Sequence, residues 1–221
     1  MPYRSPGYPP QVANEVLGRT NRVFPSVWLS LASPSENAGE GWPGRLVEAA
    51  LAANTVIDIS HNPALWGGQM RGTEACLMSM GGLEIERATE TSHATDLVQA
   101  HLIETLSAIG RDYIDFYFLR VRRGLEEFQI NGALEALEMA KQEGHIRYIG
   151  LACDGPSLAV LGLWQFHDAF EVLLVRDDEA YQTLAPIARE RRVGIIAPEN
   201  LVTVRTPEEI EAVVGAVGVS Q

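Results

Sequence analysis

Residues 101–120, HLIETLSAIGRDYIDFYFLR, decide the fold of this chain. Gly110 can adopt the left-handed conformation that ends a helix. Residues 114–119 form a short, almost wholly apolar run, typical of a strand that is covered on both faces. The stretch therefore predicts a helix, a tight turn and a buried strand. The apolar residues before the turn recur three to five positions apart, which places them on one helical face: Leu97, Val98, Leu102, Leu106 and Ile109.

Short apolar runs and helical segments alternate along the rest of the chain, and this alternation favours parallel βαβ units. The last helix has a clear start, with Thr206 as a cap, Pro207 at the first helical position and Glu209 at the third. The predicted strands are 27–32, 55–60, 75–80, 114–119, 146–152, 170–175, 193–197 and 201–205. The predicted helices are 45–53, the one that ends at 109, 129–143, 156–165, 179–192 and 206–217.

Composition and charge exclude several classes of protein. The 221 residues are 46 % apolar, which suits a globular domain with a full core. The formal net charge of −12 disfavours nucleic acid and anionic lipid as partners. No apolar run reaches the roughly 18 residues of a membrane helix, and the first residues lack the apolar core of a secretory signal. We therefore expect a soluble, cytoplasmic protein. Cys76 and Cys153 alone make neither a disulfide framework nor a zinc site, so we expect no metal.

The opening stretch resembles a segment of the aldo-keto reductases, of the form SL-x-x-L-G-x-D-Y-I-D-L-Y-x-x-H. The positions that fall on this pattern are Leu106, Gly110, Asp112, Tyr113, Ile114, Asp115 and Tyr117, and Arg120 stands where the family has its histidine. Residues 17–33 (LGRTNRVFPSVWLSLAS), 133–152 (ALEALEMAKQEGHIRYIGLA) and 204–214 (VRTPEEIEAVV) resemble three further family segments. The resemblance covers roughly residues 15–217. It implies an α/β fold, a (β/α)8 TIM-barrel-type domain spanning 1–221. Residues 1–25 are rich in Pro and Gly, which indicates an N-terminal coil or hairpin.

The seventh crossover is too short for an ordinary barrel. Only residues 198–200 separate the predicted strands seven and eight, whereas a parallel pair needs a connection of roughly a dozen residues. Three alternatives follow. The barrel is open or distorted there, the last strand is antiparallel, or a second subunit closes the gap in a homo-oligomer.

Functional groups of a β/α barrel project from the C-terminal ends of its strands. The resemblance implies an Asp, Tyr, Lys and His tetrad that transfers a hydride from NADPH. Asp58 fills the first position, and Pro63 or Trp66 falls on the tyrosine. Met80 falls on the lysine and Arg120 on the histidine. Three of the four positions thus depart from the family.

The positions that bind the cofactor in the family depart as well. Residues 150–153 (GLAC) replace a G-V-S-N segment whose side chains bind the nicotinamide amide, and Leu173 or Leu174 falls on a glutamine. No glycine fingerprint, phosphate loop or HExxH helix is present in the sequence. From these departures we predict no cofactor, with NADPH as the alternative.

The remaining candidates keep open alternatives. Asp58 is a base or a structural carboxylate, and His61 is an acid–base group or a solvated loop residue. Arg120 suits a carboxylate or phosphate ligand. Its structural alternative is a salt bridge to Asp58 or Glu199. We predict Asp58, His61 and Arg120 as catalytic. The predicted substrate-binding residues are Trp66, Cys153, Asp154, Arg176 and Glu199. Of these, Arg176 has a solvated loop pair with Asp177 as its alternative, and Cys153 could be a nucleophile or a buried thiol.

Three functions fit these observations. The first is a non-redox enzyme that binds a carboxylated or phosphorylated small molecule at the barrel mouth. The second is a non-catalytic binding or regulatory barrel. The third is an NADPH-dependent oxidoreductase that reduces a carbonyl with displaced groups.

Overall fold

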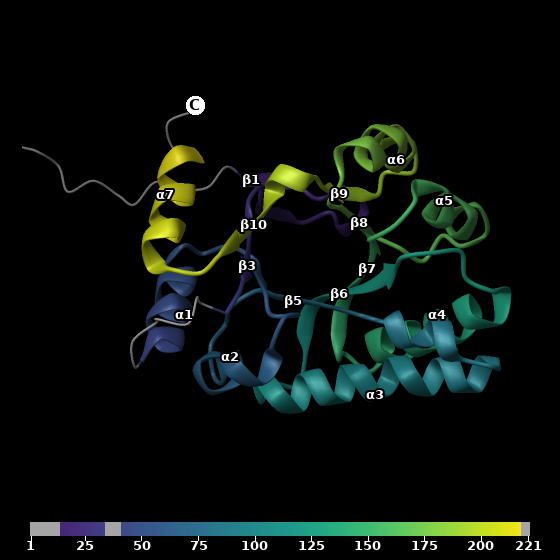
Figure 1. Ribbon diagram of the computed structural model, residues 1–221, viewed down its shortest axis with the longest axis horizontal. Coiled ribbons are helices and arrows are strands. Elements are labelled where there is room, and N and C mark those ends of the chain that lie inside the picture. The colour runs from purple at the N-terminus through teal and green to yellow at the C-terminus, as the bar shows by residue number, and fades with distance from the viewer. Residues whose placement is uncertain (1–13, 34–40, 218–221) are drawn as a thin grey trace, which may run out of the picture.

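The computed structural model describes residues 14–33 and 41–217. Its central sheet has eight parallel strands, in the order β10-β3-β4-β5-β6-β7-β8-β9. The strands stand around a central space and helices surround them, as Figure 1 shows. This arrangement confirms the predicted α/β barrel. The strands are β3 (Trp28–Leu31), β4 (Ile57–Asp58), β5 (Leu77–Gly81), β6 (Ile114–Val121), β7 (Ile146–Cys153), β8 (Val172–Val175), β9 (Gly194–Ile196) and β10 (Leu201–Val204).

Helices follow most strands. A helix of 8 residues lies between β4 and β5. The helices are α1 (Trp42–Ala52), α2 (Pro63–Met70), α3 (Thr91–Ile109), α4 (Glu127–Gln142), α5 (Ser157–Phe166), α6 (Asp178–Glu190) and α7 (Pro207–Val217), with short 3-10 helices η1 (Gly18–Thr20), η2 (Leu83–Arg87) and η3 (Pro198–Asn200).

The opening stretch folds as its sequence predicts. Gly110 ends α3 with φ 63°, and β6 begins four residues later. Asp115 on β6 is buried, accepts the backbone N–H of Leu77 at 2.9 Å and pairs with Arg147 at 2.7 Å. One carboxylate thus joins three neighbouring strands, because those partners lie on β5 and β7.

The barrel has two apolar layers because side chains alternate along each strand. One layer lies between the sheet and the helices, and the other fills the barrel interior. The antiparallel hairpin of β1 (Asn14–Val16) and β2 (Val23–Pro25) contributes Phe24 to the interior. Its ring meets Phe116 at 5.0 Å and Tyr148 at 5.8 Å, near the beginnings of β6 and β7. The hairpin therefore occupies the N-terminal end of the barrel. Residues 1–13 of the predicted coil or hairpin lie outside the described part.

The seventh crossover is replaced by a direct continuation. β9 pairs with β8, β10 pairs with β3, both pairings are parallel, and no pairing joins β9 to β10 in the part of the chain that is described. Four residues are too few to carry the chain back to the start of a new strand. We infer that the chain passes through η3 and continues in the same direction beside β3, as Figure 1 shows at the top of the ring. The last strand is thus parallel, and the sheet is distorted between β9 and β10. Closure by a second subunit stays a prediction.

Candidate functional site

The C-terminal ends of the strands form the candidate site, which we call the mouth. The strands bring polar or charged side chains there from four directions. Asp58 and Ser60 come from the end of β4, Arg120 from β6, Asp154 from just after β7, and Arg176 from just after β8. Hydrogen bonds and ion pairs decide which of them can act on a ligand.

Asp58 is 0 % exposed and is held by hydroxyl and backbone donors. Ser30 donates its hydroxyl to Oδ2 at 2.7 Å, and Ser60 donates both its backbone N–H at 2.9 Å and its hydroxyl at 2.5 Å to Oδ1. The short loop from Asp58 to Ser60 is an Asx-type turn, which explains why β4 ends earlier than predicted. Both carboxylate oxygens are therefore committed to positioning, so the geometry favours the structural alternative for Asp58.

Ser30 is the residue of this group that was not predicted from the sequence. Ser30 is buried within an otherwise apolar strand, and Ser60 also accepts the backbone N–H of Met80 at 2.8 Å. A lone serine in an apolar strand, at the level of a buried aspartate in the next strand, is the signal that could have revealed Ser30.

Arg120 pairs with Asp154. Its Nε donates to Asp154 Oδ2 at 2.6 Å, and its Nη2 contacts the same oxygen. The arginine side chain keeps 28 % of its surface exposed, against 9 % for the aspartate. Sequence reasoning offered Asp58 or Glu199 as the partner, and both are wrong: Asp58 is engaged by serines, and Glu199 lies exposed in η3. The register explains the pair, because Arg120 lies opposite Ala152 and Asp154 is two residues further on the same face.

Arg176 reaches across the mouth from the β8 side. Its Nη2 lies 3.5 Å from the sulfur of Met80 on β5, and its side chain is exposed. The predicted loop pair with Asp177 is not what the structure shows, because Asp177 caps α6 by accepting the N–H of Ala180 at 2.9 Å. The guanidinium of Arg176 therefore stands next to the position that holds lysine in the aldo-keto reductases.

Cys153 does not have the surroundings of a nucleophile. It is 3 % exposed, and its thiol donates to the carbonyl of Gly155 at 3.3 Å. Burial raises the pKa of the thiol above its ordinary value, and Asp154 and Asp177 nearby act in the same direction. The reactive thiolate is therefore disfavoured.

Trp66 and His61 do not join the polar group at the mouth. Trp66 lies on α2 with 0 % exposure, in the layer between sheet and helices, 5.5 Å from the ring of Trp42. Its helix faces the outside of the sheet, so the ring packs there and not toward a ligand. His61 is exposed in the turn after β4.

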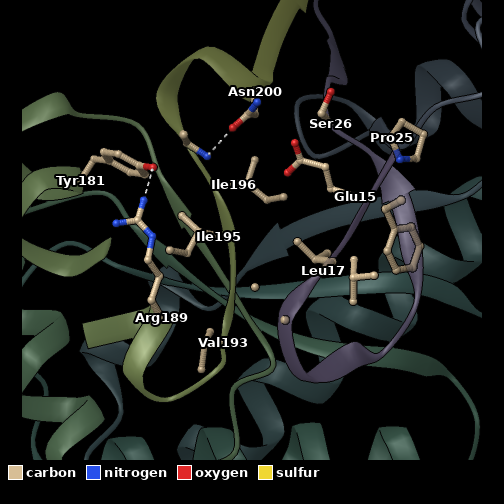
Figure 2. A pocket seen from close by; sticks show the side chains of 15 residues that line it. Glu15, Leu17, Pro25, Ser26, Tyr181, Arg189, Val193, Ile195, Ile196 and Asn200 are labelled. Atoms are coloured by element: carbon tan, nitrogen blue, oxygen red, sulfur yellow. Dashed lines mark hydrogen bonds between the residues drawn. The ribbon is translucent and has the colours of Figure 1, made fainter. Parts of the chain in front are cut away.

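A cavity of about 270 Å³ lies away from the mouth, beside β9. Figure 2 shows it between the N-terminal hairpin and α6, with Glu15 on one side and Arg189 on the other. Arg189 donates to the Tyr181 hydroxyl at 3.3 Å, and Asn200 accepts the N–H of Ala197 at 3.1 Å. None of the predicted site residues lines it.

The described residues contain no cluster of three or more His, Cys, Asp or Glu side chains that could hold a metal ion. No helix within 14–33 or 41–217 is both long and apolar enough to span a membrane.

Comparison with known proteins identifies the fold. No family model matches the chain, and no curated protein matches its sequence. Among solved structures, it is similar to the holo form of an aldo-keto reductase from Bacillus halodurans, with a TM-score of 0.74, 15 % identity, and 94 % of this chain and 91 % of that chain covered. It is also similar to an aldo/keto reductase from Klebsiella pneumoniae in complex with NADP and acetate (TM-score 0.70, 14 % identity, 97 % and 92 % covered). A third is the Bombyx mori aldo-keto reductase in complex with NADP (TM-score 0.58, 14 % identity, 94 % and 92 % covered).

The chain thus has the aldo-keto reductase fold, as the resemblance in sequence predicted. The same neighbours correct one prediction. From the altered side chains at the mouth we predicted no cofactor, and that prediction is wrong against structures of this fold that contain NADP. The altered side chains do not by themselves exclude a nucleotide.

Proposed function

We propose that this chain is an NADPH-binding barrel whose mouth binds an anionic ligand through Arg120 and Arg176. The observation that carries the proposal is the pair of guanidinium groups at the strand ends. One is paired with a single carboxylate oxygen, and the other is exposed beside a thioether. Guanidinium groups match phosphate and carboxylate oxygens in shape and charge. The NADP complexes of two neighbours of the same fold support the choice of cofactor.

The anionic part of such a nucleotide would bind at the mouth. Arg120 and Arg176 would hold phosphate or carboxylate oxygens there. Near the ends of β7 and β8 the inward-facing side chains of Ala152 and Leu174 are apolar and 0 % exposed. They would therefore offer a nicotinamide no polar side-chain group.

The reaction that this cofactor supplies is hydride transfer to a carbonyl. Arg120 would donate hydrogen bonds to a carbonyl or carboxylate oxygen, but arginine keeps its proton at any physiological pH. Met80, unlike lysine, carries no proton to give. The proton that completes a reduction would thus come from water, and the rate of reduction would show no decrease at alkaline pH from deprotonation of a protein general acid.

A second function, non-redox binding or catalysis, is favoured by one specific observation. Both oxygens of Asp58 are occupied by donors from Ser30 and Ser60, so the carboxylate predicted to move a proton is already engaged. The geometry supports binding of an anion better than proton transfer, and a regulatory barrel that binds NADPH without oxidising it is the second candidate.

Titration with NADPH tests the proposal. We expect enhanced nucleotide fluorescence on binding and at least tenfold weaker binding for Arg176→Ala and Arg120→Ala. Arg22→Ala, which removes an exposed arginine from the hairpin at the opposite end, is the control and should bind as the parent does. The absence of binding below about 100 μM in the parent protein would refute the proposal. Oxidation of bound NADPH with a panel of carbonyl compounds then separates the two functions, because only a reductase consumes it.

A further inference from the structure

We infer that Asp154 is a tethered competitor for Arg120, which an anionic ligand must displace before it can use that guanidinium. The inference rests on the proposed function and names how the same site is regulated. Nε and Nη2 of Arg120, the edge that would grip a ligand, both point at one oxygen of Asp154.

The geometry of Asp154 allows its side chain to leave while its backbone stays. Its N–H donates to the carbonyl of Val121 at 3.0 Å, which fixes the main chain to the end of β6. Gly155 follows so closely that an added Cβ would lie 2.0 Å from the carbonyl oxygen of Arg122. The backbone of the loop is therefore held in place, and we expect Arg120 to be released by rotation about the side-chain bonds of Asp154.

The charges at the mouth and the tether of Asp154 decide which ligands can compete for Arg120. Asp58 and Asp154 balance Arg120 and Arg176, so the mouth carries no net charge from these groups. A tethered carboxylate competes with the advantage of an intramolecular partner, equivalent to roughly millimolar or higher free ligand. A ligand with more than one negative charge gains from Arg176 as well and can displace it.

Removal of the tethered charge tests the inference. We expect Asp154→Asn to bind pyrophosphate, measured by calorimetry, about tenfold or more tightly than the parent chain. Asp168→Asn is the matched control. It removes the same charge from an aspartate that is also paired with an arginine, Arg19, at 2.8 Å, but on the other side of the molecule. Binding by this variant should equal that of the parent.

A measurement on the parent protein keeps the test decisive if Asp154→Asn does not fold. The Nε–Hε resonance of Arg120, assigned by its loss in Arg120→Lys, should shift when pyrophosphate is titrated. An unchanged resonance at saturating pyrophosphate would overturn the inference.

The outcomes separate this inference from the proposed function. Equal affinity in Asp154→Asn and the parent overturns the competitor and leaves anion binding intact. If Asp154→Asn binds pyrophosphate and the parent does not, the result supports Asp154 as the competitor and overturns anion binding by the parent. Binding by neither overturns both.

Discussion

The hydroxyl of Tyr117 lies 2.7 Å from Nδ1 of His101. This contact joins β6 to α3 inside the stretch that organises the fold. Burial raises the pKa of Tyr117 above its ordinary value, so the phenol keeps its proton. Burial also lowers the pKa of His101 below 6.5, with Arg120 acting in the same direction and Glu104 against it. The neutral imidazole can accept the hydrogen bond of the phenol.

This pair predicts a loss of stability in mild acid. Because the pKa of His101 is lower in the folded chain, the unfolded chain binds the proton first as the pH falls below 6.5. The free energy of unfolding should therefore decrease from about pH 6.5 downwards and be insensitive to this group above it. Urea titrations at a series of pH values should show a smaller decrease in His101→Gln than in the parent. An equal pH dependence in the two proteins would contradict the assignment.

Removal of a hydroxyl that donates to Asp58 should lower the free energy of unfolding by a measurable amount. Ser30→Ala leaves one oxygen of a fully buried carboxylate without its donor. We expect a loss of about 1–3 kcal/mol in the free energy of unfolding. Ser92→Ala removes a hydroxyl that is exposed and bonded to Glu90 on the surface, and it should change stability by less than about 0.5 kcal/mol. Similar values for the two variants would show that Asp58 does not depend on Ser30.

Two adjacent glycines on α2 predict opposite effects of one added methyl group. At Gly67 a Cβ would lie 1.9 Å from the carbonyl oxygen of Ala108, whereas at Gly68 it would meet nothing within 4 Å. Gly67→Ala must push α2 away from α3 and should destabilise the chain by about 1–3 kcal/mol. Gly68→Ala should be neutral or stabilise it by up to about 1 kcal/mol, because alanine favours helix. Thermal unfolding of the two variants makes the comparison, which fails if Gly67→Ala melts as high as Gly68→Ala.

Both thiols should be unreactive in the folded protein. Cys153 is buried, and burial together with Asp115 raises the pKa of Cys76 far above its ordinary value. A disulfide reagent at pH 7.5 should titrate no thiol rapidly in the native chain and two in denaturant. Rapid labelling of Cys153 alone would restore it as a candidate nucleophile.

Local sequence signals predicted most of the architecture. Gly110, the apolar spacing before it and the run 114–119 each describe a structure that forms within a few residues, and these elements lie where they were predicted. The Thr206 and Pro207 start of the last helix is confirmed for the same reason. Such features are set by backbone sterics and by burial on one face, which the sequence displays directly.

The side-chain pairs at the mouth could not be predicted from the sequence in the same way. Arg120 pairs with Asp154 because of the register between β6 and β7, and register is a property of two strands and not of either one. Trp66 was predicted to touch a ligand because of its place in a motif, but the orientation of α2 turns it into the layer beneath the helices. The path from β9 to β10 depended on the sheet as a whole.

Parallel pairing of Leu201–Val204 with Trp28–Leu31 means that the first core strand receives its second neighbour only when the last one has been synthesised. Until then β3 offers a bare edge to any other nascent chain. A chain without β10 and α7 should therefore aggregate during expression, and we do not expect it to fold with only a slightly lower melting temperature.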